Sequence, residues 1–130
     1  MMAPNDRKYS KEHEWVLIEE NGRVLVGITH YAQDQLGDLV FLDLLKTGTI
    51  VKQFENLGEI ESVKSVSDIY SPISGEIVQE NTKVKDQPAL VNSDPYGEGW
   101  LVRIAMSDPS ELDNLLSARQ YEAFLVAQEE

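Results

Sequence analysis

Short apolar segments separated by turn-forming residues constrain the fold of this chain more than any other feature. These segments lie at residues 39–42, 50–51, 57–63, 69–70, 75–78 and 90–91. Gly, Pro, Asn, Asp and Ser residues separate them at short intervals, a spacing typical of a small β-sandwich or a flattened barrel. We therefore expect a strand in each segment and a core that is mainly β.

The region before these strands predicts a hairpin followed by a short helix. Residues 9–18 form a first extended candidate, and the pair Asn21-Gly22 favours a tight turn into a half-buried strand up to Ile28. Thr29 is a candidate N-cap for a short helix that Gly37 would end.

The tail changes to a helical period. Asp108 is a candidate N-cap that forms a capping box with Glu111, and a second helix is expected from Ser117. The helical segment covers about 108–127. The sequence thus predicts one mainly β (α+β) domain over residues 1–130, with a short helix in its N-terminal half and C-terminal helices.

A weak internal repeat suggests two related halves. Val51-Lys52 followed by Leu57 recurs as Val84-Lys85 followed by Leu90. The repeat indicates a pseudo-two-fold sandwich, and chance similarity is the alternative. If the repeat is real, residues 61–68 form the hairpin that joins the two halves and project from one end of the sandwich.

Charge and composition exclude several classes of function. The formal net charge of −12 argues against nucleic acid or an anionic membrane as partner, and the chain has no cysteine for disulfides or thiolate chemistry. No apolar segment is long enough to cross a bilayer, and the first residues resemble neither a signal nor a transit peptide. We expect a monomer of the bacterial cytoplasm, or of the mitochondrial matrix if this is a trimmed mature chain.

Candidate catalytic groups are few. His13 stands between two glutamates on an expected strand, where neighbours point to opposite faces, so we predict no metal site there. His30 is expected at a helix entry. Lys64 is different, because small polar residues surround it at the expected tip of the hairpin. It is either an ordinary solvated lysine or the attachment point of a covalently held group, for which its long stem is suited.

Many ordered blocks of the sequence closely resemble the H-protein family of the glycine cleavage system. The blocks are Lys11-Glu12-His13-Glu14-Trp15-Val16, Leu36-Gly37-Asp38-Leu39-Val40-Phe41, Glu61-Ser62-Val63-Lys64-Ser65, Ser67-Asp68-Ile69-Tyr70-Ser71-Pro72-Ile73-Ser74-Gly75-Glu76, Leu90-Val91-Asn92 and Asp94-Pro95-Tyr96-Gly97-Glu98-Gly99-Trp100. The similarity runs from Tyr9 to Tyr121. One departure is Gln35, which stands where some members carry a histidine.

The resemblance implies a lipoyl/biotinyl-like β-sandwich that carries lipoate on Lys64 as N6-lipoyllysine. Glu61, Ser62, Val63, Ser65 and Asp68 then form the context of this site. It also implies a non-catalytic carrier that takes the aminomethyl group of glycine from the decarboxylase (P-protein) to the aminomethyltransferase (T-protein). The dihydrolipoyl dehydrogenase (L-protein) reoxidises the arm, and a lipoate ligase or a lipoyl/octanoyl transferase attaches the lipoate.

The family is expected to protect its loaded arm in a surface cleft, because water hydrolyses the adduct. Glu14 and Trp15 are the candidates for that cleft, and an acidic Glu14 would hold the cationic amine. The alternative is a surface carboxylate beside a core indole.

Three other functions stay open on the sequence. The chain could be a relay that donates lipoate to other enzymes, or a lipoyl or biotinyl domain of another complex. Biotinyl domains usually flank the lysine with methionines, whereas Val63 and Ser65 flank Lys64. An enzyme acting alone is the third, and the shortage of catalytic groups argues against it.

Overall fold

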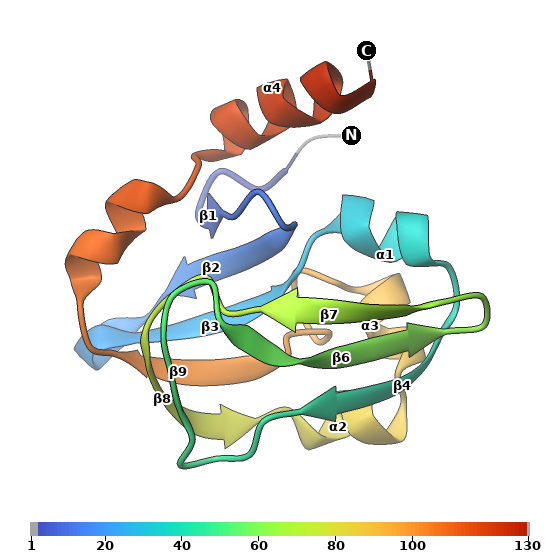
Figure 1. The fold of residues 1–130 in the computed structure, drawn as a ribbon, viewed down its shortest axis with the longest axis horizontal. Coiled ribbons are helices and arrows are strands. Elements are labelled where there is room, and N and C mark those ends of the chain that lie inside the picture. Colours follow the sequence, from blue (N-terminus) through green and yellow to red (C-terminus); the bar gives the residue numbers. More distant parts are fainter. Residues whose placement is uncertain (1–2, 130) are drawn as a thin grey trace.

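The computed structural model describes residues 3–129 and folds into two packed sheets with helices at the edges (Figure 1). The strands are β1 (Lys8–Tyr9), β2 (Glu14–Ile18), β3 (Arg23–Ile28), β4 (Leu39–Leu44), β5 (Ile50–Val51), β6 (Asn56–Ser62), β7 (Val66–Tyr70), β8 (Gly75–Glu80) and β9 (Val102–Met106). The helices are α1 (His30–Leu36), α2 (Thr82–Asp86), α3 (Ala89–Ser93) and α4 (Ala118–Glu129), with 3₁₀ turns at Glu20–Gly22 and Pro109–Asn114.

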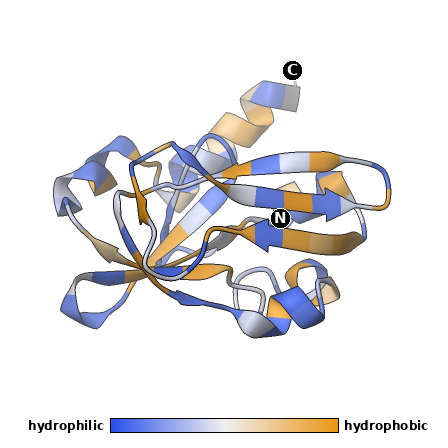
Figure 2. Ribbon diagram, turned by 60° about the horizontal axis from the view of Figure 1, so that its bottom comes forward, coloured by the Kyte–Doolittle hydropathy of each residue, from blue (hydrophilic) through white to orange (hydrophobic). Residues whose placement is uncertain are grey.

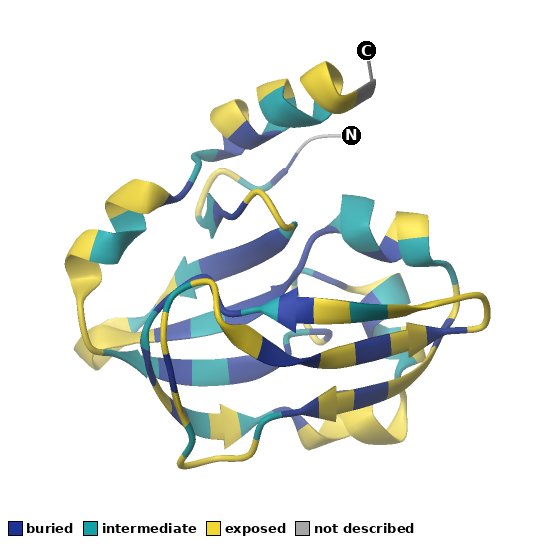
Figure 3. Cartoon of the chain, in the orientation of Figure 1, coloured by how far each residue is buried: buried dark blue, intermediate teal, exposed yellow. Residues whose placement is uncertain are grey.

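The sheets are antiparallel and differ in size. The larger has the order β1-β2-β3-β9-β8-β5, and the smaller has the order β4-β6-β7. Along β6, buried positions largely alternate with exposed ones, and its apolar residues Leu57 and Ile60 are buried whereas Glu59 and Glu61 are exposed (Figures 2 and 3). Apolar side chains such as Val24, Ile60 and Ile104 fill the space between the sheets. The expected mainly β sandwich is confirmed.

A second apolar cluster lies on the other face of the larger sheet. It contains Tyr9, Trp15, Ala118 and Tyr121, so helix α4 closes this side of the molecule (Figure 1). The rings of Tyr9 and Tyr121 stack with their centroids 4.8 Å apart. Successive residues of β2 therefore serve different clusters, with Trp15 on this face and Val16 between the sheets.

Local turn signals in the sequence are confirmed. Asn21 and Gly22 adopt positive φ angles of 61° and 73° between β2 and β3. The hydroxyl of Thr29 accepts the backbone N–H of Ala32 at the start of α1, and Gly37 ends the helix at a φ of 84°. The expected hairpin at residues 61–68 is formed by β6 and β7.

Two expected strands are wrong. Residues 9–18 do not form one strand, because His13 turns the chain with a φ of 73° and separates β1 from β2. Leu90 and Val91 belong to helix α3 rather than to a strand. Helix α2 likewise contains Val84 of the suspected repeat, whereas Val51 lies in a strand, so the repeated residues do not share a secondary structure.

Of the two contacts expected in the capping box at the tail, the one from Asp108 forms and the one from Glu111 does not. Asp108 does cap the 3₁₀ turn by accepting the N–H of Ser110. Glu111 does not turn back to Asp108, because its carboxylate accepts the N–H and the hydroxyl of Ser74 at 2.8 and 2.6 Å. A tertiary contact thus replaces the local one. Within residues 3–129, no helix combines the length and the apolar character needed to cross a membrane.

The packing of Trp15 against Gly27 gives a first prediction. A Cβ at Gly27 would lie 2.5 Å from the indole ring, which hydrogen bonds hold in place. We expect Gly27→Ala to lower the free energy of unfolding by about 1–3 kcal/mol through overpacking. Urea titration measures the free energy of unfolding. The loss caused by Gly27→Ala should be smaller in a Trp15→Phe background, because the smaller ring leaves room for the added Cβ. An equal cost in both backgrounds would contradict the assigned contact.

Candidate functional site

The turn between β6 and β7 is organised by the side chain of Ser62. The backbone N–H of Ser62 donates to the carbonyl of Ser65 at 2.8 Å and closes the turn. The buried Ser62 hydroxyl accepts the N–H groups of Lys64 and Ser65 at 3.3 and 3.1 Å. Polar residues can thus form a tight tip on a hairpin whose strands are held by apolar packing.

Lys64 lies at this tip and is exposed. Its stem passes over Gly37, where a Cβ would lie 3.5 Å from Cε of the lysine. The adjacent N–H of Val63 donates to the carbonyl of Asp38 at 3.1 Å, so the tip is tied to the end of α1. Among residues 3–129, no side chain forms a hydrogen bond or an ion pair with Nζ of Lys64. A primary amine on a fixed turn can carry a group through an amide bond.

The other residues of this block surround the turn without converging on the amine. Glu61 and Asp68 are exposed on the outer face of the smaller sheet. Asp68 pairs in register with Glu59, and Glu61 pairs with Val66. Val63 is 71% exposed. The block therefore presents Lys64 on an acidic, partly apolar surface.

Glu14 bridges the two sheets at their edge. It begins β2 and is only 2% exposed. Its carboxylate accepts the hydroxyl of Ser10 at 2.5 Å and the backbone N–H of Tyr70 at 3.2 Å. Because β7 is an edge strand of the smaller sheet, Glu14 satisfies an N–H that has no neighbouring strand.

Burial controls the charge of Glu14. Removal from water raises its pKa from 4.5 to about 8, although the bonds from Ser10 and Tyr70 oppose this shift. A cavity of about 420 Å³ is lined by both partners and by Glu12 and Phe54, whereas Glu14 lies behind Ser10 and Tyr70 and does not itself line it. A carboxyl with this pKa is largely protonated at neutral pH.

Trp15 points away from Glu14, into the cluster beneath α4. Its side chain is fully buried, and Nε1 donates to the carbonyls of Ile28 and Pro95, both at 3.0 Å. The guanidinium of Arg7 covers the ring at 4.7 Å from its centroid. Trp15 thus fixes β2 rather than lining the cavity beside Glu14.

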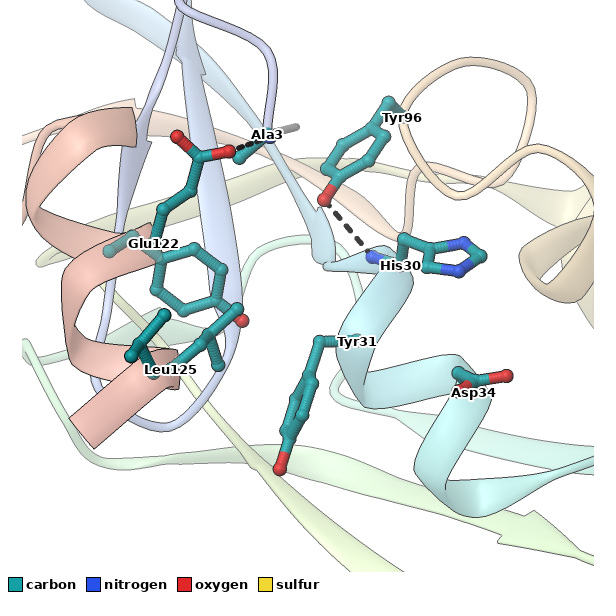
Figure 4. Close-up of a pocket in the computed structure, with 9 residues that line it drawn as sticks. Ala3, His30, Tyr31, Asp34, Tyr96, Glu122 and Leu125 are labelled. Atoms are coloured by element: carbon teal, nitrogen blue, oxygen red, sulfur yellow. Dashed lines mark hydrogen bonds between the residues drawn. The ribbon is translucent and has the colours of Figure 1, made fainter. Parts of the chain in front are cut away.

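The histidines lie in the region between α1 and α4. The Nδ1 atom of His13 is 2.8 Å from the hydroxyl of Tyr121. His30 starts α1, as expected, and borders a cavity of about 530 Å³ between α1 and α4 (Figure 4). No residue of the Lys64 turn lines this cavity. Within the described chain, no three His, Asp or Glu side chains cluster to hold a metal.

The sequence gives several supporting residues no role at the Lys64 turn or beside Glu14. Gly37 and Asn92 occur in the motif blocks, but only the fold brings them to the Lys64 turn. Ser10 and Tyr70 carry no sequence signal that links them to Glu14, because one lies in a turn and the other donates through its backbone.

The raised pKa of Glu14 predicts a pH-dependent stability. The folded protein keeps the proton up to about pH 8, whereas the unfolded chain loses it near 4.5. The folded state therefore binds more protons between these values, and stability falls as pH rises. Relative to Glu14→Gln, we expect the wild type to lose on the order of 3 kcal/mol between about pH 5 and pH 8 in urea titrations.

The exposed Glu20, whose charge does not contribute to the raised pKa of Glu14, provides the control for this measurement. Glu20→Gln leaves Glu14 and its partners Ser10 and Tyr70 in place, so its free energy of unfolding should fall with pH as that of the wild type does. If the difference in free energy of unfolding between the wild type and Glu14→Gln does not change with pH, Glu14 ionises normally in the folded protein and the prediction is wrong.

Comparison with known proteins identifies the family. The family model described as "Glycine cleavage H-protein" matches residues 7–128. The glycine cleavage system H protein of Symbiobacterium thermophilum is 56% identical over 122 residues, which are 94% of each chain. That of Escherichia coli is 52% identical over 123 residues, 95% of each chain.

A solved structure agrees with these relatives. The crystal structure of a glycine cleavage system H protein from Mycobacterium marinum has a TM-score of 0.85 and 44% sequence identity. The match covers 93% of this chain and 97% of that one. The two-sheet fold with its Lys64 hairpin and the sequence similarity lead to one conclusion: this chain belongs to the glycine cleavage H-protein family.

Proposed function

We propose that the chain serves as the lipoyl carrier of the glycine cleavage system through lipoate in amide linkage to Lys64. As a family member it is a carrier and not itself an enzyme. The observation that carries the assignment to Lys64 is an exposed primary amine on a turn held by two backbone–backbone hydrogen bonds and by two N–H groups that donate to the Ser62 hydroxyl.

The side chain of Lys64 fits this cofactor chemically. Its amine is the nucleophile toward an activated lipoyl carboxyl group. The N–C bond of the amide forms, the bond to the activating group breaks, and the amine loses its proton to solvent. When attached, lipoate supplies a disulfide that accepts the aminomethyl group of glycine. The long lysine stem extends the reach of the disulfide from a hairpin that stays fixed.

Partners follow from this role. We propose the P-protein as donor of the aminomethyl group, the T-protein as its acceptor and the L-protein as the enzyme that reoxidises the arm. A lipoate ligase or a lipoyl/octanoyl transferase modifies Lys64. The relatives are bacterial proteins, which supports a role in the bacterial cytoplasm.

Glu14 is proposed to hold the loaded arm. A cationic amine near the buried carboxylate favours its ionised form and lowers its pKa. Loading would then release the proton of Glu14 and form a charge-assisted hydrogen bond away from bulk water. Trp15 contributes indirectly, because its two hydrogen bonds fix the strand from which Glu14 projects.

Lipoylation tests the assignment of Lys64. We expect incubation with lipoate ligase, ATP and lipoate to add one lipoyl group, which peptide mapping locates at Lys64. Lys64→Arg keeps the charge and the stem but should gain no lipoyl group. A lipoyl group on another lysine, or none on folded wild type, would contradict the proposal.

Retention of the loaded group tests Glu14. Hydrolysis of the loaded arm consumes water and yields formaldehyde, ammonia and the free thiol. We expect Glu14→Gln to accelerate formaldehyde release on the order of tenfold, since a charge-assisted bond is lost. Glu20→Gln, at an exposed position just after the other end of β2 that lines neither the cavity beside Glu14 nor the one beside α1, should behave as the wild type. Equal rates in all three proteins would remove Glu14 from this role.

A further inference from the structure

Asn92 makes three hydrogen bonds near the base of the Lys64 turn. It lies in α3, and its Nδ2 donates to the carbonyl of Gly37 and to Oε1 of Gln33, both at 2.9 Å. Its Oδ1 accepts the backbone N–H of Leu39 at 3.0 Å. One side chain thus holds the residues on both sides of Asp38.

These bonds require an amide at position 92. Both donors of Nδ2 face oxygen atoms, and the single acceptor faces an N–H group. A carboxylate of the same shape would place negative charge against the oxygens of Gly37 and Gln33. Gln33 is itself buried, so little water can compensate for the lost bonds.

The residues that Asn92 holds are the ones that touch the Lys64 turn. The carbonyl of Asp38 accepts the N–H of Val63, the residue before the lysine. Gly37 lies beneath the lysine stem, close enough that a Cβ there would contact Cε at 3.5 Å. Helix α3, the 37–39 turn and the hairpin tip therefore form one continuous support.

We propose that Asn92 is a positioning residue for Lys64. By fixing residues 37–39, it holds the surface over which the lysine stem lies and the carbonyl to which the hairpin tip is bonded. The amine then meets the activated acyl group from a restricted set of orientations, and acylation is faster than from a mobile turn. This inference rests on the proposed lipoylation of Lys64.

The chain offers a matched control. Asn81 also donates from Nδ2 to two carbonyls, those of Glu98 and Trp100, and accepts one N–H, that of Lys83. None of these partners belongs to the 37–39 turn or to the hairpin. Asn81→Asp therefore imposes the same chemical change elsewhere in the fold.

The experiment compares lipoylation kinetics of Asn92→Asp and Asn81→Asp at a temperature where both are folded. For Asn92→Asp we expect kcat to fall on the order of tenfold while KM for the carrier stays unchanged. A variant that merely unfolds in part would show a higher apparent KM and an unchanged kcat. Asn92→Ala and Asn81→Ala, which add no charge, replace the pair if either aspartate variant does not fold.

Amide hydrogen exchange gives a readout that does not depend on lipoylation. We expect faster exchange at Leu39 and Val63 in Asn92→Asp and not in Asn81→Asp, because these amides donate to Asn92 and to Asp38. Equal exchange, or equal kcat in the two variants, would overturn the inference. If wild type is not lipoylated at all, the proposed function fails, and the exchange data alone decide whether Asn92 fixes the turn.

Discussion

Apolar packing between the two sheets determines where Lys64 lies. Leu57 and Ile60 of β6 and Ile69 of β7 point into the space between the sheets. Because side chains alternate along a strand, a shift of one residue would turn these apolar groups to solvent. The register of the hairpin is therefore fixed, and the polar turn with its lysine must project beyond the packed region (Figure 1). A carrier needs this combination of a rigid base and an accessible amine.

Glu14 is a buried carboxyl group in a sandwich whose interior is otherwise filled mainly by apolar side chains. On the inward face of β2, where Val16 is buried, the chain places a carboxyl group with a pKa raised to about 8. Such a group costs stability unless it is protonated or paired. Its bonds to Ser10 and Tyr70 orient it, and its protonation avoids a buried charge at neutral pH. Residues that break a local rule in this way are common at functional sites.

Local signals predicted the parts of this fold that local chemistry determines. Asn21-Gly22 and Gly37 specify their turns through backbone preferences, and Thr29 caps its helix through its side chain. The hairpin around Lys64 follows from two hydrophobic segments on either side of small polar residues. Tertiary contacts determine the rest. Glu111 binds Ser74 instead of its own helix, and Leu90–Val91 lies in a helix because apolar residues alone do not distinguish a short strand from a buried helix. The environment of Glu14 is also nonlocal, since one of its partners is a backbone amide 56 residues away.

Reconstitution with a pyridoxal-phosphate-dependent glycine decarboxylase tests the central claim most directly. The measured quantity is glycine-dependent release of carbon dioxide in the presence of the lipoylated chain. If Lys64 carries the accepting group, the lipoylated wild type supports release, whereas the unmodified wild type and Lys64→Arg treated with the ligase do not. Equal release with Lys64→Arg, or none with wild type lipoylated at Lys64, would contradict the assignment of this chain as the carrier through that residue.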